Sequence, residues 1–199
     1  MRALAFSLGL AVTLSGATAR GQGTDPPRRS SWVIPTLHGG GQLLLQRVGL
    51  SVLYGSAFTL DDPARAAQSF GRAWTTPPLF DASRRVFEWD RDIFYINLFG
   101  HGLMGSELYL RARQCGHDFA SSLLFTAGMS FAWEYLVESW HAQPSALDLV
   151  WTPLGGALIG EFRYVAWELA GRLPPTPRRV VRAIVDPFGE LERGLGSDC

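Results

Sequence analysis

Side chains that can transfer protons or bind metal ions lie within otherwise apolar sequence at four positions: His101, Glu134, Glu138 and Asp148. An ionised carboxyl group is costly in apolar surroundings unless it is paired. We therefore expect these groups to face one another in the interior of the protein. Burial and neighbouring charges can move the pKa values of such groups towards neutrality. A cluster of this kind could act as general acid and base, or it could hold a metal ion.

Smaller polar side chains accompany these residues on the same helix faces. Residues three or four positions apart lie on one face of an α-helix, so neighbours at this spacing extend each polar face. Together with a further acid, Glu161, they make up a predicted structural polar network. The smaller polar residues of this network are Asn97, Ser130, Ser145 and Thr152.

A purely structural role would explain the same residues. Ser145 and Asp148 could do no more than cap the start of a helix. Glu134 and Glu138 could form ion pairs with arginines of neighbouring helices, namely Arg111, Arg113 or Arg163. Three hypotheses stay open at this point: a structural polar network, a ligand or metal site, and a catalytic site.

Long apolar helices must position the cluster. Apolar periodicity and capping residues predict three of them, from Asp90 or Asp92 to about Cys115, from Asp118 to about His141, and from Ser145 to near Gly171. Pro153 either kinks the third helix or begins a new one. Shorter amphipathic helices are expected at 42–58, 63–74 and 178–184. Because no stretch alternates as a strand does, we predict an all-α helical bundle.

The chain divides into four parts. Arg2, the apolar run after it and the sequence Ala17-Thr18-Ala19 predict a signal peptide over residues 1–19. Residues 20–41 are expected to form a linker and an extended arm, flexible from Gly39 to Gly41. The helical bundle domain spans residues 42–172. Residues 173–199 are expected to form a Pro-rich spacer and a short C-terminal helix.

Composition narrows the class of partner. The formal net charge is zero, which argues against a nucleic-acid partner. Only 18% of the residues are charged, below the roughly one quarter that is usual for soluble domains. This shortage favours contact with a membrane lipid or an envelope protein. Cys115 and Cys199 could form a disulfide in an oxidising compartment.

The same shortage of charge bears on whether the helices are embedded in a membrane. The longest uncharged stretch among the three long helices runs from Phe119 to Trp133, shorter than a usual membrane span. Extended past one acid, each helix would reach spanning length. Two interpretations stay open. One is a periplasmic bundle with unusually apolar helices, and the other is a small membrane bundle with a polar interior. We favour membrane association.

A series of motifs follows in fixed order between Asp92 and Glu161. They are Asn97, Gly100-His101, Gly105-Ser106, Ala112-Arg113, Ser130, Trp133-Glu134-Tyr135, Glu138, Pro144-Ser145, Asp148-Leu149, Thr152-Pro153, Gly156 and Gly160-Glu161. This series resembles an uncharacterised bacterial envelope family, the domain of unknown function 3943. Gly102 departs from the family pattern, which has Pro there. A weaker likeness connects the series with VanZ-type membrane proteins.

The resemblance implies a shared fold and site but supplies no activity. We expect an exported protein of the bacterial envelope, either periplasmic or membrane-associated. The first functional hypothesis is a helical structural or assembly protein held together by a buried polar network. One alternative is an envelope enzyme acting on lipid or cell-wall material, with Glu134 or Glu138 as acid or base and His101 as partner. The other is a metal- or ligand-binding protein. No cofactor is predicted.

Overall fold

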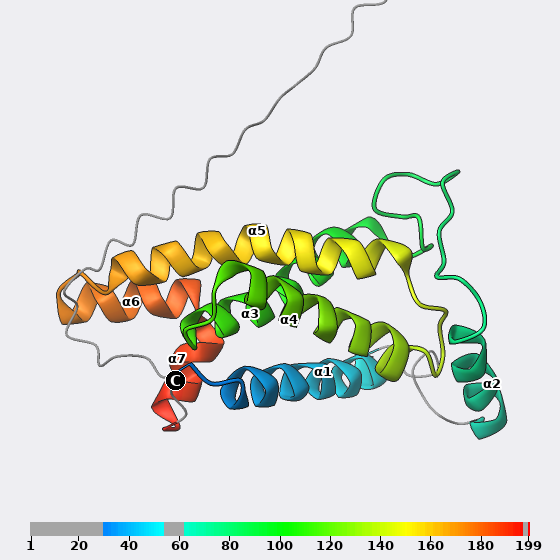
Figure 1. Cartoon of the computed structure of the whole chain (residues 1–199), viewed down its shortest axis with the longest axis horizontal. Helices are drawn as coiled ribbons and strands as arrows, with labels where there is room; N and C mark the ends of the chain where they lie inside the picture. The colour runs from blue at the N-terminus through cyan, green and yellow to red at the C-terminus, as the bar shows by residue number, and fades with distance from the viewer. Residues whose placement is uncertain (1–29, 54–61, 197–198) are drawn as a thin grey trace, which may run out of the picture.

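The computed structural model describes residues 30–53, 62–196 and 199 (Figure 1). Within these ranges every regular element is a helix, which confirms the all-α fold class. The expected signal peptide, 1–19, lies outside the described residues.

Three long helical units form the centre of the bundle, as the sequence predicted. The first is η2 (Ile96–His101) continued by α3 (Gly102–Gln114), the second is α4 (Phe119–Ala132) continued by η3 (Trp133–Glu138), and the third is α5 (Ala146–Ala170). Asp118 caps α4 by accepting a hydrogen bond from Ser121 N at 2.7 Å. Pro153 lies inside α5 and does not divide it. Figure 1 shows α5 running alongside α3 and α4.

Glycines allow α3 and α5 to pack at backbone distance. A Cβ atom at Gly156 would lie 2.5 Å from the carbonyl carbon of Gly105, and one at Gly160 would lie 2.7 Å from Tyr109 Cδ1. Such distances are below van der Waals contact, so these positions require the absence of a side chain. The close packing sets the separation of the two helices that carry the site described below.

Helix α1 (Val33–Leu53) begins much earlier than expected. The prediction of an extended arm with flexible glycines is therefore wrong for residues 33–41. Glycine lowers helix propensity, but burial of one face outweighs this local preference. Gly39 is buried against Met129 and Leu108, where a Cβ atom would stand 2.8 Å from Met129 Cε. Leu43 then enters the apolar core.

Short helices flank the bundle. Helix α2 (Pro63–Ala73) is capped by Asp62, close to the predicted bounds. The C-terminal region contains two helices where one was expected, α6 (Pro175–Val185) and α7 (Pro187–Gly194). Asp186, which follows the helix predicted at 178–184, caps α7 by accepting a hydrogen bond from Gly189 N at 2.9 Å.

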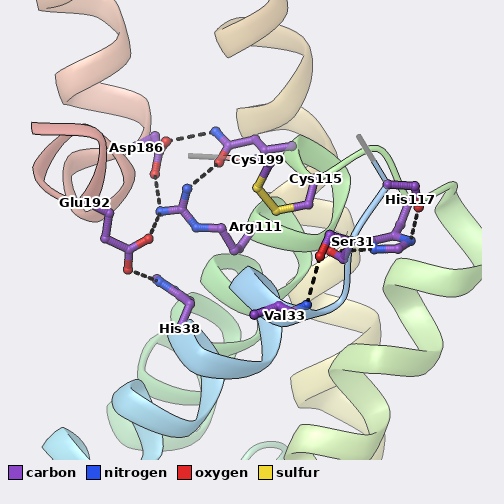
Figure 2. The surroundings of a disulfide bond; sticks show 11 residues. Ser31, Val33, His38, Arg111, Cys115, His117, Asp186, Glu192 and Cys199 are labelled. Atoms are coloured by element: carbon purple, nitrogen blue, oxygen red, sulfur yellow. Dashed lines mark hydrogen bonds and ion pairs between the residues drawn. A yellow bond between two sulfur atoms is a disulfide. The ribbon is translucent and has the colours of Figure 1, made fainter. Parts of the chain in front are cut away.

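A disulfide joins the end of α3 to the end of the chain. It links Cys115, which is fully buried, with Cys199 across 84 residues of sequence (Figure 2). Beside it, Asp186 accepts hydrogen bonds from Gln114 Nε2 at 2.8 Å and from Arg193 Nη2 at 2.6 Å. The covalent link and this polar cluster hold the C-terminal helices against α3.

The structure also bears on whether the helices cross a membrane. No helix in the described ranges combines the length and apolarity that crossing a bilayer requires. The preference for membrane-embedded helices therefore finds no support in the structure.

Candidate metal centre

Two π-helical turns present the site residues. Turn η2 carries Asn97 and His101, and turn η3 carries Glu134 and Glu138. Each turn is continuous with an α-helix of the central bundle. A π-helical turn inserts an extra residue and changes where the following side chains point, and such turns are frequent at functional sites. Helical periodicity alone does not reveal them, so the sequence predicted uninterrupted helices here.

The structure brings together three of the four predicted site residues: His101, Glu134 and Asp148. Each offers one ligand atom, and these atoms all lie within 4.8 Å of one another. The Nε2 atom of His101 lies 3.5 Å from Asp148 Oδ2. All three side chains are buried, Glu134 and Asp148 almost completely. The expected convergence of three helices on one interior cluster is thus observed.

Smaller polar residues fix the orientation of the cluster. Thr152 Oγ1 shares a hydrogen bond of 3.2 Å with His101 Nδ1. When Nδ1 carries the proton and donates to Thr152, the lone pair on Nε2 faces Asp148 and is free to bind an ion. Ser130 Oγ donates to the backbone carbonyl of Asp148 at 3.1 Å.

The start of α5 is tied directly to Glu134. The backbone N–H of Ser145 donates to Glu134 Oε2 at 2.7 Å. Ser145 Oγ accepts from the backbone N–H of Asp148 at 3.1 Å, so Ser145 is the helix cap that the sequence predicted. Asp148, which the sequence paired with Ser145 in capping this helix, does not accept the bond from the Ser145 N–H; Glu134 accepts it instead. Residues 134 and 145 therefore hold the second and third helical units in register at the cluster.

Asp90 belongs to this network, although the sequence suggested only a helix cap. It accepts hydrogen bonds of 2.6 Å from both Asn97 Nδ2 and Ser145 Oγ, and it is buried. Neither Asp90 nor Asp92 caps the first helix, because η2 begins after Tyr95 without a side-chain cap. The missed signal was an acid seven residues before Asn97, a spacing that spans about 10 Å within one helix and is too long there for a direct hydrogen bond. Only the loop that folds back onto η2 brings them together.

Two carboxylate oxygens of the cluster have no hydrogen-bond partner among the described residues: Glu134 Oε1 and Asp148 Oδ1. Glu134 is 1% exposed and Asp148 is 2% exposed. A buried oxygen that could accept a hydrogen bond but does not costs free energy. A cation bound between these two carboxyl groups and the imidazole of His101 would satisfy both oxygens.

Burial governs the protonation of the three residues. Burial raises the pKa of Asp148 to about 9, with the Asp90 carboxylate as the next cause. Burial also raises the pKa of Glu134 well above its usual value, followed by the charges of Glu138 and Asp148. Burial lowers the pKa of His101 to about 4. At neutral pH the imidazole is therefore neutral, the form that binds metals, while Asp148 retains a proton that an ion would displace.

Two predicted site residues lie outside the three-residue cluster. Glu138 is one turn beyond Glu134, and burial, followed by the charge of Asp92, raises its pKa to about 7. Glu161 is at the other end of the α3–α5 contact, where it accepts hydrogen bonds from Tyr109 Oη at 2.6 Å and Arg113 Nε at 2.9 Å. Glu161 is thus a polar contact between helices, separate from the cluster.

The ion pairs proposed for Glu134 and Glu138 are not found in the described part of the chain. The three arginines bind other acids: Arg111 pairs with Glu192, Arg113 with Glu161 and Arg163 with Glu107. Glu134 therefore has no arginine from this set to neutralise its charge.

The donor set restricts the kind of ion. One imidazole nitrogen with two carboxylates suits a borderline divalent metal such as Zn²⁺, Fe²⁺ or Mn²⁺. Ca²⁺ is bound by oxygen donors, so a buried imidazole argues against it.

Comparison with known proteins places the three residues of the cluster, His101, Glu134 and Asp148, within one family match. The model of the family described as Domain of unknown function (DUF3943) matches residues 86–188, more than half of the chain. This confirms the resemblance inferred from 92–161 and extends it at both ends. The comparisons do not show the weaker likeness to VanZ-type proteins. Searches of the curated proteins and of the solved structures each found no significant match. The chain therefore belongs to the DUF3943 family.

Proposed function

We propose that this protein binds a divalent transition-metal ion through His101, Glu134 and Asp148. The proposal is carried by one observation: each of the three residues places a ligand atom within 4.8 Å of the others. In addition, one oxygen of each buried carboxyl group has no hydrogen-bond partner among the described residues. The three ligands come from three different helical units, so an ion bound to them would cross-link the centre of the bundle. The role of the ion in this proposal is structural, in keeping with a protein held together by a buried polar site.

Metal analysis of the purified full-length chain tests the proposal. The protein would be freed of metal with a chelator, incubated with Zn²⁺ or Mn²⁺, desalted and measured by elemental analysis. We expect an equimolar amount of one ion in the wild type and little in Glu134→Gln or Asp148→Asn. Both substitutions keep the size of the side chain and remove the charge that an ion requires.

Glu138→Gln is the matched control. It removes a half-buried acid from the same π-helical turn but leaves the three ligands intact, so it is expected to retain the ion. Equal metal content in wild type and Asp148→Asn would contradict the proposal, as would equal loss in Glu138→Gln.

We also infer that the protein is exported to the cell envelope. The signal-peptide pattern at residues 1–19 supports this location. The Cys115–Cys199 disulfide supports it independently, because disulfides persist in oxidising compartments. Outward-facing apolar side chains on α5, namely Leu154, Leu158 and Phe162, favour a membrane lipid or an envelope protein as partner.

Fractionation of expressed protein tests the location. Washed membranes would be extracted with carbonate at high pH, which releases peripheral proteins. We expect the mature chain in the envelope fraction and its release by carbonate. Recovery of unprocessed chain from the cytoplasm would contradict export.

A further inference from the structure

A large cavity lies between α1, α3 and the junction of α6 with α7. Its volume is about 900 Å³, within the range of roughly 300–1,000 Å³ that is usual for ligand sites. Most of its wall is apolar and is formed by Ile34, Leu37, Leu45, Leu103, Ile184 and Phe188. None of the three metal-site residues is among its lining, so this cavity is a separate feature of the fold.

The polar part of the cavity wall is centred on His38. Its Nδ1 atom lies 2.6 Å from Glu192 Oε1, and Figure 2 shows this contact between α1 and α7. A carboxylate oxygen can only accept, so Nδ1 carries the proton and donates. The other ring nitrogen, Nε2, lies 3.6 Å from Glu107 Oε1. Glu107 also lines the cavity, so its carboxylate contributes acceptors to this wall.

Two glutamines on α1 add to these acceptors. His38, Gln42 and Gln46 are spaced four residues apart and share the face of α1 that lines the cavity. Gln42 Nε2 donates to the backbone carbonyl of Met104 at 3.3 Å, which leaves its Oε1 atom as the free group.

Four buried polar atoms of this wall, three of them amide or carboxylate oxygens, have no hydrogen-bond partner among the described residues. They are His38 Nε2, Gln42 Oε1, Gln46 Oε1 and Glu107 Oε1. The second oxygen of Glu107 is already occupied by the guanidinium of Arg163. The cavity therefore combines a long apolar wall with a cluster of acceptors that lacks donors.

We propose that this cavity binds a single-chain amphiphile whose head group donates hydrogen bonds, an alkyl amine or an alkyl alcohol. The head group lies among His38, Gln42 and Glu107 and supplies the missing donors. The alkyl chain lies along the apolar wall, where its removal from water drives binding. A carboxylate or phosphate head group is disfavoured because it would bring further acceptors, and negative charge, against Glu107.

Calorimetric titration of the full-length protein with three probes tests head-group selectivity. The probes are n-decylamine, n-decanol and n-decanoate, each kept below its micelle concentration, so that the chain is constant and only the head group varies. We expect the amine and the alcohol to bind at least about tenfold more tightly than decanoate, the effect of about one hydrogen bond to a charged group. Absence of binding by the amine and the alcohol, or equal binding by decanoate, would overturn the proposal.

A pair of glycine substitutions on α1 locates the binding site. Gly41 lines the cavity, and a Cβ atom there would meet no neighbour within 4 Å, so Gly41→Leu can fill the space without a clash. Gly49 lies on the same helix, is equally free of neighbours and is not among the lining residues. We expect Gly41→Leu to weaken decylamine binding at least about tenfold and Gly49→Leu to leave it unchanged. Equal effects of both would place binding elsewhere and overturn the assignment.

Gln42→Leu tests the head-group contact itself. It removes one acceptor but keeps the apolar wall and the Glu107–Arg163 pair. We expect the preference for decylamine over decanoate to narrow several-fold, whereas an unchanged preference would overturn the assigned position of the head group.

Discussion

Gly105 of α3 lies directly against the backbone of Thr152 in α5, so that a Cβ atom built on Gly105 would overlap the carbonyl oxygen of Thr152. Thr152 is also the residue whose hydroxyl shares a hydrogen bond with His101, one helical turn before Gly105. The contact that sets the separation of the two helices therefore also sets the position of the imidazole. Packing and site geometry are coupled at this point.

Gly105→Ala is expected to destabilise the protein and weaken metal binding together. The added methyl group must push α5 away, and overpacking of this kind costs about 2–3 kcal/mol. The displacement also moves Asp148 away from His101. Urea unfolding with and without Zn²⁺ measures both effects.

Gly128→Ala provides the control for this substitution. Gly128 lies within α4, where a Cβ atom would meet nothing within 4 Å. Alanine there is expected to be neutral or to stabilise by up to about 1 kcal/mol, because it raises helix propensity. Similar losses in both variants would show that the close contact at Gly105 is not the cause.

The long helices and their meeting point could be predicted from the sequence because both follow from local rules. Apolar periodicity predicted the three helices, and the caps Asp118 and Ser145 predicted where two of them begin. The cost of burying an isolated acid predicted that His101, Glu134, Glu138 and Asp148 meet, and the structure brings all of these except Glu138 into one cluster. These arguments need only the types and spacing of residues on one helix.

The remaining features depend on contacts between segments distant in sequence. Asp90 joins the cluster through a loop, and the bond from Ser145 N to Glu134 replaces the one expected within the helix start. Apolar periodicity along one helix does not predict the two π-helical turns. They arise where packing between helices decides which way the side chains of the turn point. Residues 33–41 are helical because Gly39 packs against α3 and α4, a contact that local propensity does not contain.

Metal-free protein is expected to lose stability as the pH rises from 7 towards 9. The pKa of Asp148 is raised to about 9, so the folded state holds this proton more tightly than the unfolded chain does. Stability from such a group is present at low pH and is lost as the pH rises through the folded-state pKa. The pKa values of His101 and His141 are lowered to about 4, so neither imidazole changes charge above pH 7. The expected loss is on the order of 2 kcal/mol.

Urea unfolding at pH 7 and pH 8.5, with chelator and with excess Mn²⁺, measures this dependence. A bound ion replaces the protons, so we expect the metal-loaded protein to show a smaller loss or a gain over the same range. Stability of the metal-free protein that stays constant or rises with pH would contradict the assignment of a protonated Asp148.

Removal of the disulfide is expected to weaken the attachment of the C-terminal helices. Cys115→Ser opens a link between residues 84 positions apart, and loss of such a link typically costs about 2–4 kcal/mol. Asp186 contacts Gln114 and Arg193 beside the disulfide. The backbone amides of this region are then expected to exchange their hydrogens faster. Thermal unfolding of wild type with and without a reducing agent measures the effect, and Cys115→Ser should show no further response to reduction. An unchanged wild-type melting temperature on reduction would show that the disulfide does not contribute.

Asp148→Asn distinguishes two roles for this residue. Asp148 is either an ion ligand or an ionised member of a structural polar network. Asparagine resembles the protonated carboxyl group that burial favours, so the metal-free variant should be at least as stable as wild type at pH 8.5. The same variant should gain nothing from added Zn²⁺ or Mn²⁺, whereas the stability of wild type should rise with the logarithm of the ion concentration once it exceeds the dissociation constant. Urea unfolding of both proteins with and without ion gives the comparison. If Asp148→Asn is instead less stable than metal-free wild type at every pH, the ionised carboxylate itself supports the fold, and Asp148 is a structural partner of His101 and not an ion ligand.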